Sequence, residues 1–389
     1  MEMNKRVLSL DILRGICIMI VLIHHVSIDS IPNMPELTGL TGFIFWKIRG
    51  LGWSGVDLFF VLSGFLIGGL LLSELEQFKK INIKRFLLRR GLKIWPSYYF
   101  LIVVLALFGA TNWIREGDFS DQLTQVIVHV LYLQNYFDIG TNGPTWSLTI
   151  EEHFYTILPF LILAIYNFSD KVNKNLKSLP IVMSIIIILI IANRFIHSYN
   201  VDDLKNHFML SHFRFDSLLA GVVIQYFYRN NKEKMKALLT KHQLTIFSLA
   251  FLCVIPSMFW GRNTPFMFTL GFALLTLGYG LILSRVICHG FGSFESTYAA
   301  KALAHIGCWS YNIYLWHFFL PKLFKPFYEP IQIAISNIST VPEIVLLIQA
   351  TFYIGLSILV GYLATVIIEK PFLKLRSKYV PQGFKPNVI

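Results

Sequence analysis

Long apolar stretches recur along this chain from near its start to near its end, and they constrain its fold more than any other feature. Hydrophobic residues make up 55% of the sequence, charged residues only 14%, and the mean hydropathy is +0.59. In hydrocarbon every backbone amide must bond within its own segment, so such a chain crosses a bilayer as helices of about 20 apolar residues. The sequence therefore predicts an all-α, polytopic membrane bundle.

Ten stretches are long and apolar enough to be read as transmembrane helices. An eleventh, residues 125–137, is short, and we expect it to belong to an outer loop over 111–149 rather than to cross. The ten predicted spans are residues 10–28, 53–73, 94–110, 150–168, 179–197, 210–228, 243–260, 265–284, 303–324 and 343–368.

The distribution of Lys and Arg orients these spans. With ten spans and a cytoplasmic N-terminus, most of the 34 basic residues fall in inner segments, as the positive-inside rule requires. If 125–137 crossed as well, every later segment would change sides and most of the flanking basic residues would lie outside. We therefore expect both termini to be cytoplasmic.

The formal net charge of +12 is concentrated beside the predicted spans, for example in 79–93 and 370–378. Anionic headgroups account for that pattern, so we expect membrane lipids and no nucleic acid as partners. The loops are short and contain no repeat. We expect one membrane domain over 1–378, followed by a short cytoplasmic tail over 379–389.

Two ionisable residues in the first span are the most informative ones. Arg14 and His25 are 11 positions apart, which places them on one helix face and about 16 Å apart along the axis. A charge at a span centre costs about 2.5–3.5 kcal/mol and needs a partner or a water-filled cavity. Alternatively, Arg14 extends to the inner headgroups and His25 to the outer ones.

Further polar residues fall into two groups on the predicted topology. An outer group of imidazole and carboxylates suits proton transfer, and an inner basic run suits binding of an anion such as a phosphorylated cofactor. The structural alternatives are a buried Arg214–Asp216 pair, a core role for His317, and a basic run that only sets topology. The outer group is Asp57, Glu151, Glu152, Arg214, Asp216 and His317; the inner run is Lys84, Arg85, Arg89, Arg90 and Lys93.

Several segments, taken in their order along the chain, resemble segments of the acyltransferase 3 family of bacterial membrane O-acyltransferases. The resemblance covers residues 8–376. Arg14 and His25 fill the family's Arg-x10-His pattern, and 310–317 is similar to a later segment. One departure is Arg90-Gly-Leu-Lys93, where the family has Arg-x-x-Arg, because lysine keeps the charge but loses the planar fork. The other similar segments are GVDLFFVLSGFLI, RFLLRRGLKIWPSYY, TWSLTIEEHFY, RFDSLLAG and IEKPF.

The resemblance implies transfer of an acyl group, usually acetyl from acetyl-CoA, to a hydroxyl of an envelope glycan such as lipopolysaccharide O-antigen or exopolysaccharide. It implies a bacterial cytoplasmic (inner) membrane location and a stand-alone form without an appended hydrolase-like domain. His25 is the expected general base, Glu151 orients it, and His24 or His317 are substitutes. The expected CoA ligands are Arg14, Arg89, Arg90 and Lys93, and the expected substrate-binding residues are Asp57, Trp146, Glu152, Arg214 and Asp216.

A transporter or glycan exporter is the main rival interpretation, because transporters also bury ionisable residues along their path. The two halves show no inverted repeat that would favour it. His24-x4-Asp29 matches the spacing of glycerolipid acyltransferases, but this spacing is common by chance and straddles a span edge. No His-Glu-x-x-His or paired-Cys pattern is present, so we expect no metal.

Overall fold

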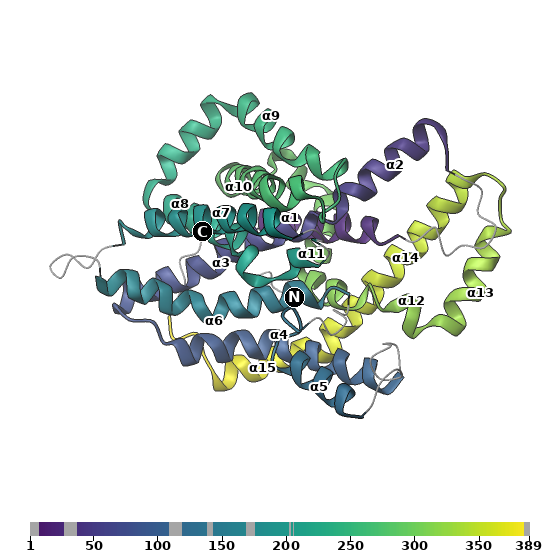
Figure 1. Ribbon diagram of the computed structural model, residues 1–389, viewed down its shortest axis with the longest axis horizontal. Helices are drawn as coiled ribbons and strands as arrows, with labels where there is room; N and C mark the ends of the chain where they lie inside the picture. Colours follow the sequence, from purple (N-terminus) through teal and green to yellow (C-terminus); the bar gives the residue numbers. More distant parts are fainter. Residues whose placement is uncertain are drawn as a thin grey trace.

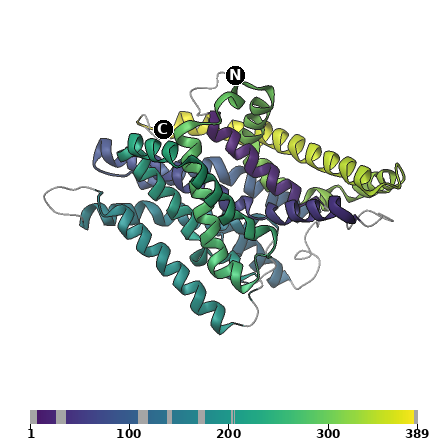
Figure 2. The ribbon, with the colours of Figure 1, turned by 90° about the horizontal axis from the view of Figure 1, so that it is seen from above.

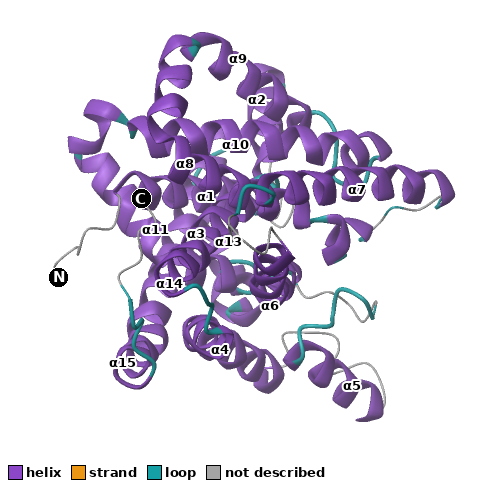
Figure 3. Cartoon of the chain, turned by 90° about the vertical axis from the view of Figure 1, so that its left-hand side faces the viewer, coloured by secondary structure: helices purple, strands orange, loops and turns teal. Residues whose placement is uncertain are grey.

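The computed structural model describes residues 8–26, 37–108, 119–137, 143–168, 176–201, 204 and 206–384. Asp29, residues 109–118 and the last five residues of the predicted tail lie outside this set. Regular structure within it is entirely helical (Figure 1, Figure 3). The all-α prediction is therefore confirmed for the described part of the chain.

The helices cover most of the described sequence. Two short segments, η5 and η7, are π-helical. In chain order the elements are α1 (Leu8–His24), α2 (Gly39–Gly52), α3 (Gly55–Phe78), α4 (Ile83–Phe108), α5 (Phe119–Val130), α6 (Thr145–Phe168), α7 (Leu179–Asn200), η2 (His207–Met209), η3 (Ser211–Phe213), α8 (Phe215–Lys241), α9 (Gln243–Val254), η4 (Ile255–Met258), η5 (Met267–Gly271), α10 (Phe272–His289), η6 (Gly292–Ser296), α11 (Tyr298–Trp316), α12 (Leu320–Leu323), α13 (Lys325–Ser336), α14 (Pro342–Ala364), η7 (Thr365–Glu369) and α15 (Lys370–Tyr379).

Each of the ten predicted spans overlaps one of these helices. Among the described residues, six helical segments are long and apolar enough to cross a membrane, and the pair α8 and α9, bent by 86°, is a seventh if it forms one span. With 17 and 19 residues, α1 and α11 are short helices. The protein is thus a polytopic membrane protein, while the count of ten and the sides of the termini stay predictions.

Glycines allow the central helices to touch. A Cβ on Gly15 of α1 would lie 2.1 Å from the carbonyl oxygen of Leu303, and one on Gly307 of α11 would lie 1.9 Å from that of Asp11. Without a hydrophobic driving force between helices in lipid, close backbone packing at small residues holds such pairs together. The α1–α11 contact therefore fixes which residues of the two helices meet.

A second glycine contact joins α3 to α8. A Cβ on Gly64 would lie 1.8 Å from the carbonyl oxygen of Leu218. Around these pairs, other helices leave apolar side chains uncovered, as at Ile188 of α7 and Leu347 of α14, which are 63% and 67% exposed. Helix α14 runs out to one edge of the molecule (Figure 2). Lipid tails are the natural neighbours of these faces.

Candidate functional site

A cavity of about 140 Å³ lies inside the bundle, between α1, α3, α4, α6 and α11. Its walls are apolar for much of their length, with Phe59, Leu66 and Ile94 among them. A concave, largely apolar site with a few converging polar groups is the usual form of a small-molecule site. The polar side chains that line it are Arg14, Ser63, Arg90, Lys93, Ser147, Glu151, Tyr155, Cys308, Ser310, Tyr311 and Tyr314.

Three cations line this cavity. Arg90 and Lys93 are three residues apart on α4 and so share one helix face, while Arg14 comes from α1. Arg14 also forms an ion pair with Asp11 at 2.9 Å, and its side chain is 26% exposed. The paired carboxylate offsets part of the cost of placing Arg14 in the bundle.

Arg89, the fourth predicted CoA ligand, is not among the residues that line the cavity. Its guanidinium donates to the carbonyl of Val380 at the end of α15. One residue on α4 corresponds to about 100° of rotation, so neighbours such as Arg89 and Arg90 point in different directions. Three of the four expected positions, Arg14, Arg90 and Lys93, therefore line one cavity, and Arg89 does not.

Glu151 and Glu152 also point in different directions. The Tyr155 hydroxyl donates to Glu151 Oε2 at 3.0 Å and lies 2.6 Å from Ser63 Oγ, so Glu151 belongs to the cavity. Glu152 instead accepts a hydrogen bond of 3.1 Å from Nε1 of Trp95 and is not among the lining residues. The two adjacent carboxylates thus belong to separate environments.

His25 and His317 meet where α1 and α11 end. Their ring centroids are 4.9 Å apart. Nδ1 of His25 lies 3.0 Å from the Val21 carbonyl oxygen, and Nδ1 of His317 lies 2.7 Å from that of Tyr314. A carbonyl only accepts, so each Nδ1 carries a proton, and in the neutral form of each ring the lone pair is on Nε2.

This bonding corrects the expected pairing of Glu151 with His25. The single Nδ1–H that a carboxylate would hold is already given to the Val21 carbonyl, and Glu151 is held by Tyr155. His24, a suggested substitute base, donates from Nδ1 to the backbone carbonyl of Arg49 at 2.8 Å. Arg49 Nε donates in return to the backbone carbonyl of His24 at 3.2 Å. It therefore joins α1 to α2.

Tyr314 connects the cavity to the two histidines. It lines the cavity, its ring centroid is 5.6 Å from that of His317, and its hydroxyl is 2.6 Å from Ser147 Oγ. Arg262 is half-buried over the ring of Phe208, 4.4 Å from its centroid. Tyr314 lies three residues before His317 within the segment 310–317, so helical spacing indicates their contact, whereas nothing in the sequence indicated Arg262.

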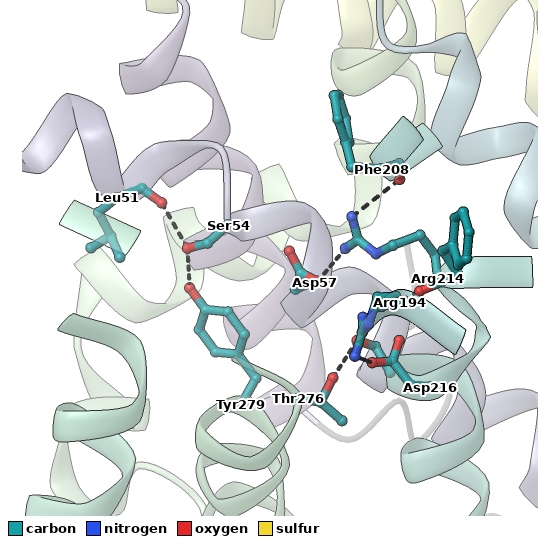
Figure 4. A network of polar contacts seen from close by, with 11 residues as sticks. Leu51, Ser54, Asp57, Arg194, Phe208, Arg214, Asp216, Thr276 and Tyr279 are labelled. Atoms are coloured by element: carbon teal, nitrogen blue, oxygen red, sulfur yellow. Dashed lines mark hydrogen bonds and ion pairs between the residues drawn. The ribbon is translucent and has the colours of Figure 1, made fainter. Parts of the chain in front are cut away.

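Two buried ion pairs lie next to this region (Figure 4). Arg214 pairs with Asp57, and Arg194 pairs with Asp216 at 2.8 Å. All four side chains are 0–1% exposed. The alternative Arg214–Asp216 pair is therefore wrong: each carboxylate takes a different arginine, and Arg194 was not predicted because it lies within an apolar span of α7.

Aromatic rings enclose the first of these pairs. The Arg214 guanidinium lies 3.8 Å from the Phe272 ring centroid and 5.8 Å from that of Trp146. Trp146 in turn packs edge-on against Phe208 at 5.2 Å. Of the five predicted substrate-binding residues, Asp57, Arg214 and Asp216 lie in these two ion pairs, Trp146 packs against Arg214, and Glu152 accepts a hydrogen bond from Trp95.

The described residues contain no group of three or more His, Cys, Asp and Glu side chains arranged to hold a metal ion. The described features define a class: a polytopic helical membrane protein with a cavity lined by three cations and, close to it, two adjacent histidines. Comparison with known protein families identifies the family within this class. A family model described as an acyltransferase domain matches residues 7–366, so the chain belongs to the acyltransferase 3 family.

The relatives that the chain resembles carry O-acetyltransferase names. The chain is 28% identical over 407 residues to a Staphylococcus aureus (strain MRSA252) protein with a provisional O-acetyltransferase name, covering 98% of this chain and 61% of the relative. It is 26% identical over 402 residues to the peptidoglycan O-acetyltransferase OatA of Listeria monocytogenes, covering 98% and 58%. The chain thus spans about three fifths of these relatives. No solved structure matches it.

Proposed function

We propose that this protein transfers an acyl group, most simply acetyl, from acyl-CoA to a hydroxyl of a cell-envelope glycan. The proposal rests on the arrangement of the site, which has three cations at one end and two histidines at the other. Arg14, Arg90 and Lys93 line one cavity, and Tyr314 connects this cavity to His25 and His317. Arg14 and His25 are about 16 Å apart along α1, which is a suitable length for an extended thioester arm.

The cationic wall would bind the donor. Phosphate groups are bound by arginine and lysine through charge-assisted hydrogen bonds, and Arg90 presents the planar fork that Lys93 lacks. In the proposed topology this wall opens toward the cytoplasm, where CoA is made. The ten spans, the cytoplasmic termini and the location in the bacterial cytoplasmic membrane belong to the same proposal.

His25 would act as the general base. Its Nε2 accepts the proton of the acceptor hydroxyl while the hydroxyl oxygen attacks the thioester carbonyl carbon. The C–S bond then breaks, and the CoA thiolate leaves with the proton that the imidazole returns. The end of α1 favours the transient imidazolium, because unpaired carbonyls at a helix C-terminus attract a cation. His317 holds the same tautomer beside it, and Glu151 polarises the cavity through Tyr155.

The proposed acceptor class rests on the names of the relatives rather than on the site. The Listeria relative is named for peptidoglycan, and lipopolysaccharide O-antigen and exopolysaccharide offer the same hydroxyl chemistry. Purified protein in proteoliposomes should release thiol from acetyl-CoA only when one of these glycans is present, and the glycan should gain the mass of one acetyl group. Glycan flux across the vesicles without thiol release would instead support an exporter.

A further inference from the structure

Three residues on one face of α6 mark the direction from the histidines to the cations. Ser147, Glu151 and Tyr155 follow one another at intervals of four residues, so they share a face and span about 12 Å. Ser147 Oγ lies 2.6 Å from the hydroxyl of Tyr314, whose ring adjoins one of the two histidines. At the other end, the Arg90 guanidinium lies 5.9 Å from the Tyr155 ring centroid. This face of α6 therefore follows the cavity from one end of the proposed site toward the other.

Helix α3 brings a single hydroxyl to this face. Ser63 is half-buried, and it is the one polar residue that α3 contributes to the cavity lining. The other lining residues of α3 are Val56, Phe59, Phe60, Leu62, Leu66 and Ile67. The Ser63 Oγ lies 2.6 Å from the Tyr155 hydroxyl. A ligand that extends along the cavity therefore meets this hydroxyl within an otherwise apolar wall.

The hydrogen bonds of Tyr155 determine where the Ser63 proton lies. The Tyr155 hydroxyl donates to Glu151 Oε2 at 3.0 Å, which uses its only proton. In the short contact between Tyr155 and Ser63, the serine must therefore be the donor. A serine hydroxyl has one proton and two lone pairs. Ser63 thus presents lone pairs to the cavity, and it can accept a hydrogen bond from a ligand but has no proton to give.

The rest of the lining decides which kind of hydrogen-bond donor fits beside Ser63. An ammonium group is disfavoured, because Arg14, Arg90 and Lys93 line the same cavity. A phosphate has no N–H group and would lie close to the carboxyl group of Glu151. With a volume of about 140 Å³, the cavity suits a narrow and neutral chain better than a nucleotide. An amide N–H is a neutral donor that needs a partner when it is buried, and Ser63 offers one.

We propose that Ser63 accepts a hydrogen bond from an amide N–H of the pantetheine arm of the acyl donor. This inference rests on the proposed function, in which acyl-CoA supplies the acyl group. The pantetheine arm carries amide groups between its phosphate end and its sulfur. One of them can lie at Ser63 while the phosphates bind the cations and the thioester extends toward His25. Acyl carrier proteins carry the same arm, so they are a second source of this chemistry.

Equilibrium binding to the purified full chain in detergent tests the contact. The probes are CoA and adenosine 3′,5′-bisphosphate, which has adenosine phosphates but no pantetheine arm. Ser63→Ala should weaken CoA binding about tenfold, because it leaves an amide N–H of the arm unpaired, and should not change binding of the bisphosphate. Ser63→Thr keeps the hydroxyl and should bind CoA as the wild type does. Ser357→Ala is the matched control, because its hydroxyl donates to the Tyr353 carbonyl and lies outside the cavity lining.

A carrier protein that bears the pantetheine arm is the third probe. If the wild type binds it but not CoA, and Ser63→Ala weakens that binding about tenfold, the contact stands and the arm belongs to a carrier protein. Unchanged binding of CoA and of the carrier protein by Ser63→Ala would overturn the role of Ser63 and leave the proposed donor intact. An equal loss of CoA and bisphosphate binding would also overturn it, as general damage to the cavity. If the wild type binds none of the three probes, the proposed donor itself is wrong, and this contact with it.

Discussion

The imidazole rings of His25 and His317 lie 4.9 Å apart, one following α1 and the other ending α11. Each ring gives its Nδ1 proton to a backbone carbonyl of its own helix. The helices themselves therefore fix the tautomer, a task that a carboxylate performs in many catalytic sites. Both Nε2 atoms are left as acceptors, beside a cavity lined with cations.

His25→Ala should lower kcat of acetyl transfer by about 10²–10⁴-fold, the usual contribution of a general base. The KM for acetyl-CoA should change little, because the cations that line the cavity remain. Thiol release from proteoliposomes at matched protein level measures both constants. His317→Ala is the comparison: a larger loss there than in His25→Ala would transfer the role of base to His317.

Arg90→Gln and Lys93→Gln should each raise the KM for acetyl-CoA about tenfold, as expected for loss of one charge-assisted contact of 1.5–3 kcal/mol with partial compensation by its neighbours. Arg89→Gln is the matched control, because the Arg89 guanidinium bonds Val380 and does not line the cavity. An equal rise in KM for all three variants would show that the basic run acts by general attraction rather than through this wall.

Arg194→Met should strongly lower the thermal unfolding midpoint in detergent. It leaves the Asp216 carboxylate without its ion-pair partner among side chains that are 0–1% exposed, and breaking such a pair costs about 3–5 kcal/mol. Adding Asp216→Leu should recover much of the loss, because the unpaired charge is then gone. If the double variant is no more stable than Arg194→Met, the pair is not the source of the effect.

Gly15→Ala should disrupt the α1–α11 contact, since its Cβ would lie 2.1 Å from the Leu303 carbonyl oxygen. The two helices would have to separate, and the His25–His317 arrangement with them. We expect loss of activity together with a lower unfolding midpoint. Gly355→Ala in α14 has nothing within 4 Å of the new Cβ and should preserve both properties; the same behaviour in both variants would contradict this account.

Hydrophobic content alone determined the class of fold. Backbone amides in a bilayer must be satisfied within each segment, so the apolar stretches had to be helices, and each predicted span overlaps one. Helical period also placed Arg14 and His25 on one face. The family motifs also pointed to part of the cavity, because Arg14, Arg90, Lys93 and Glu151 were all named from the sequence and all line it.

Only tertiary structure decided which of these residues meet. Arg89 and Arg90 are neighbours in sequence, yet one bonds Val380 and the other lines the cavity. Asp57 forms an ion pair with Arg214, and Asp216 forms one with Arg194, because the packing of α3, α7 and α8 sets these partners. Sequence spacing fixes direction within one helix, whereas contacts between helices depend on where glycines let the backbones approach, and this is why the His25–His317 pair emerged from the fold.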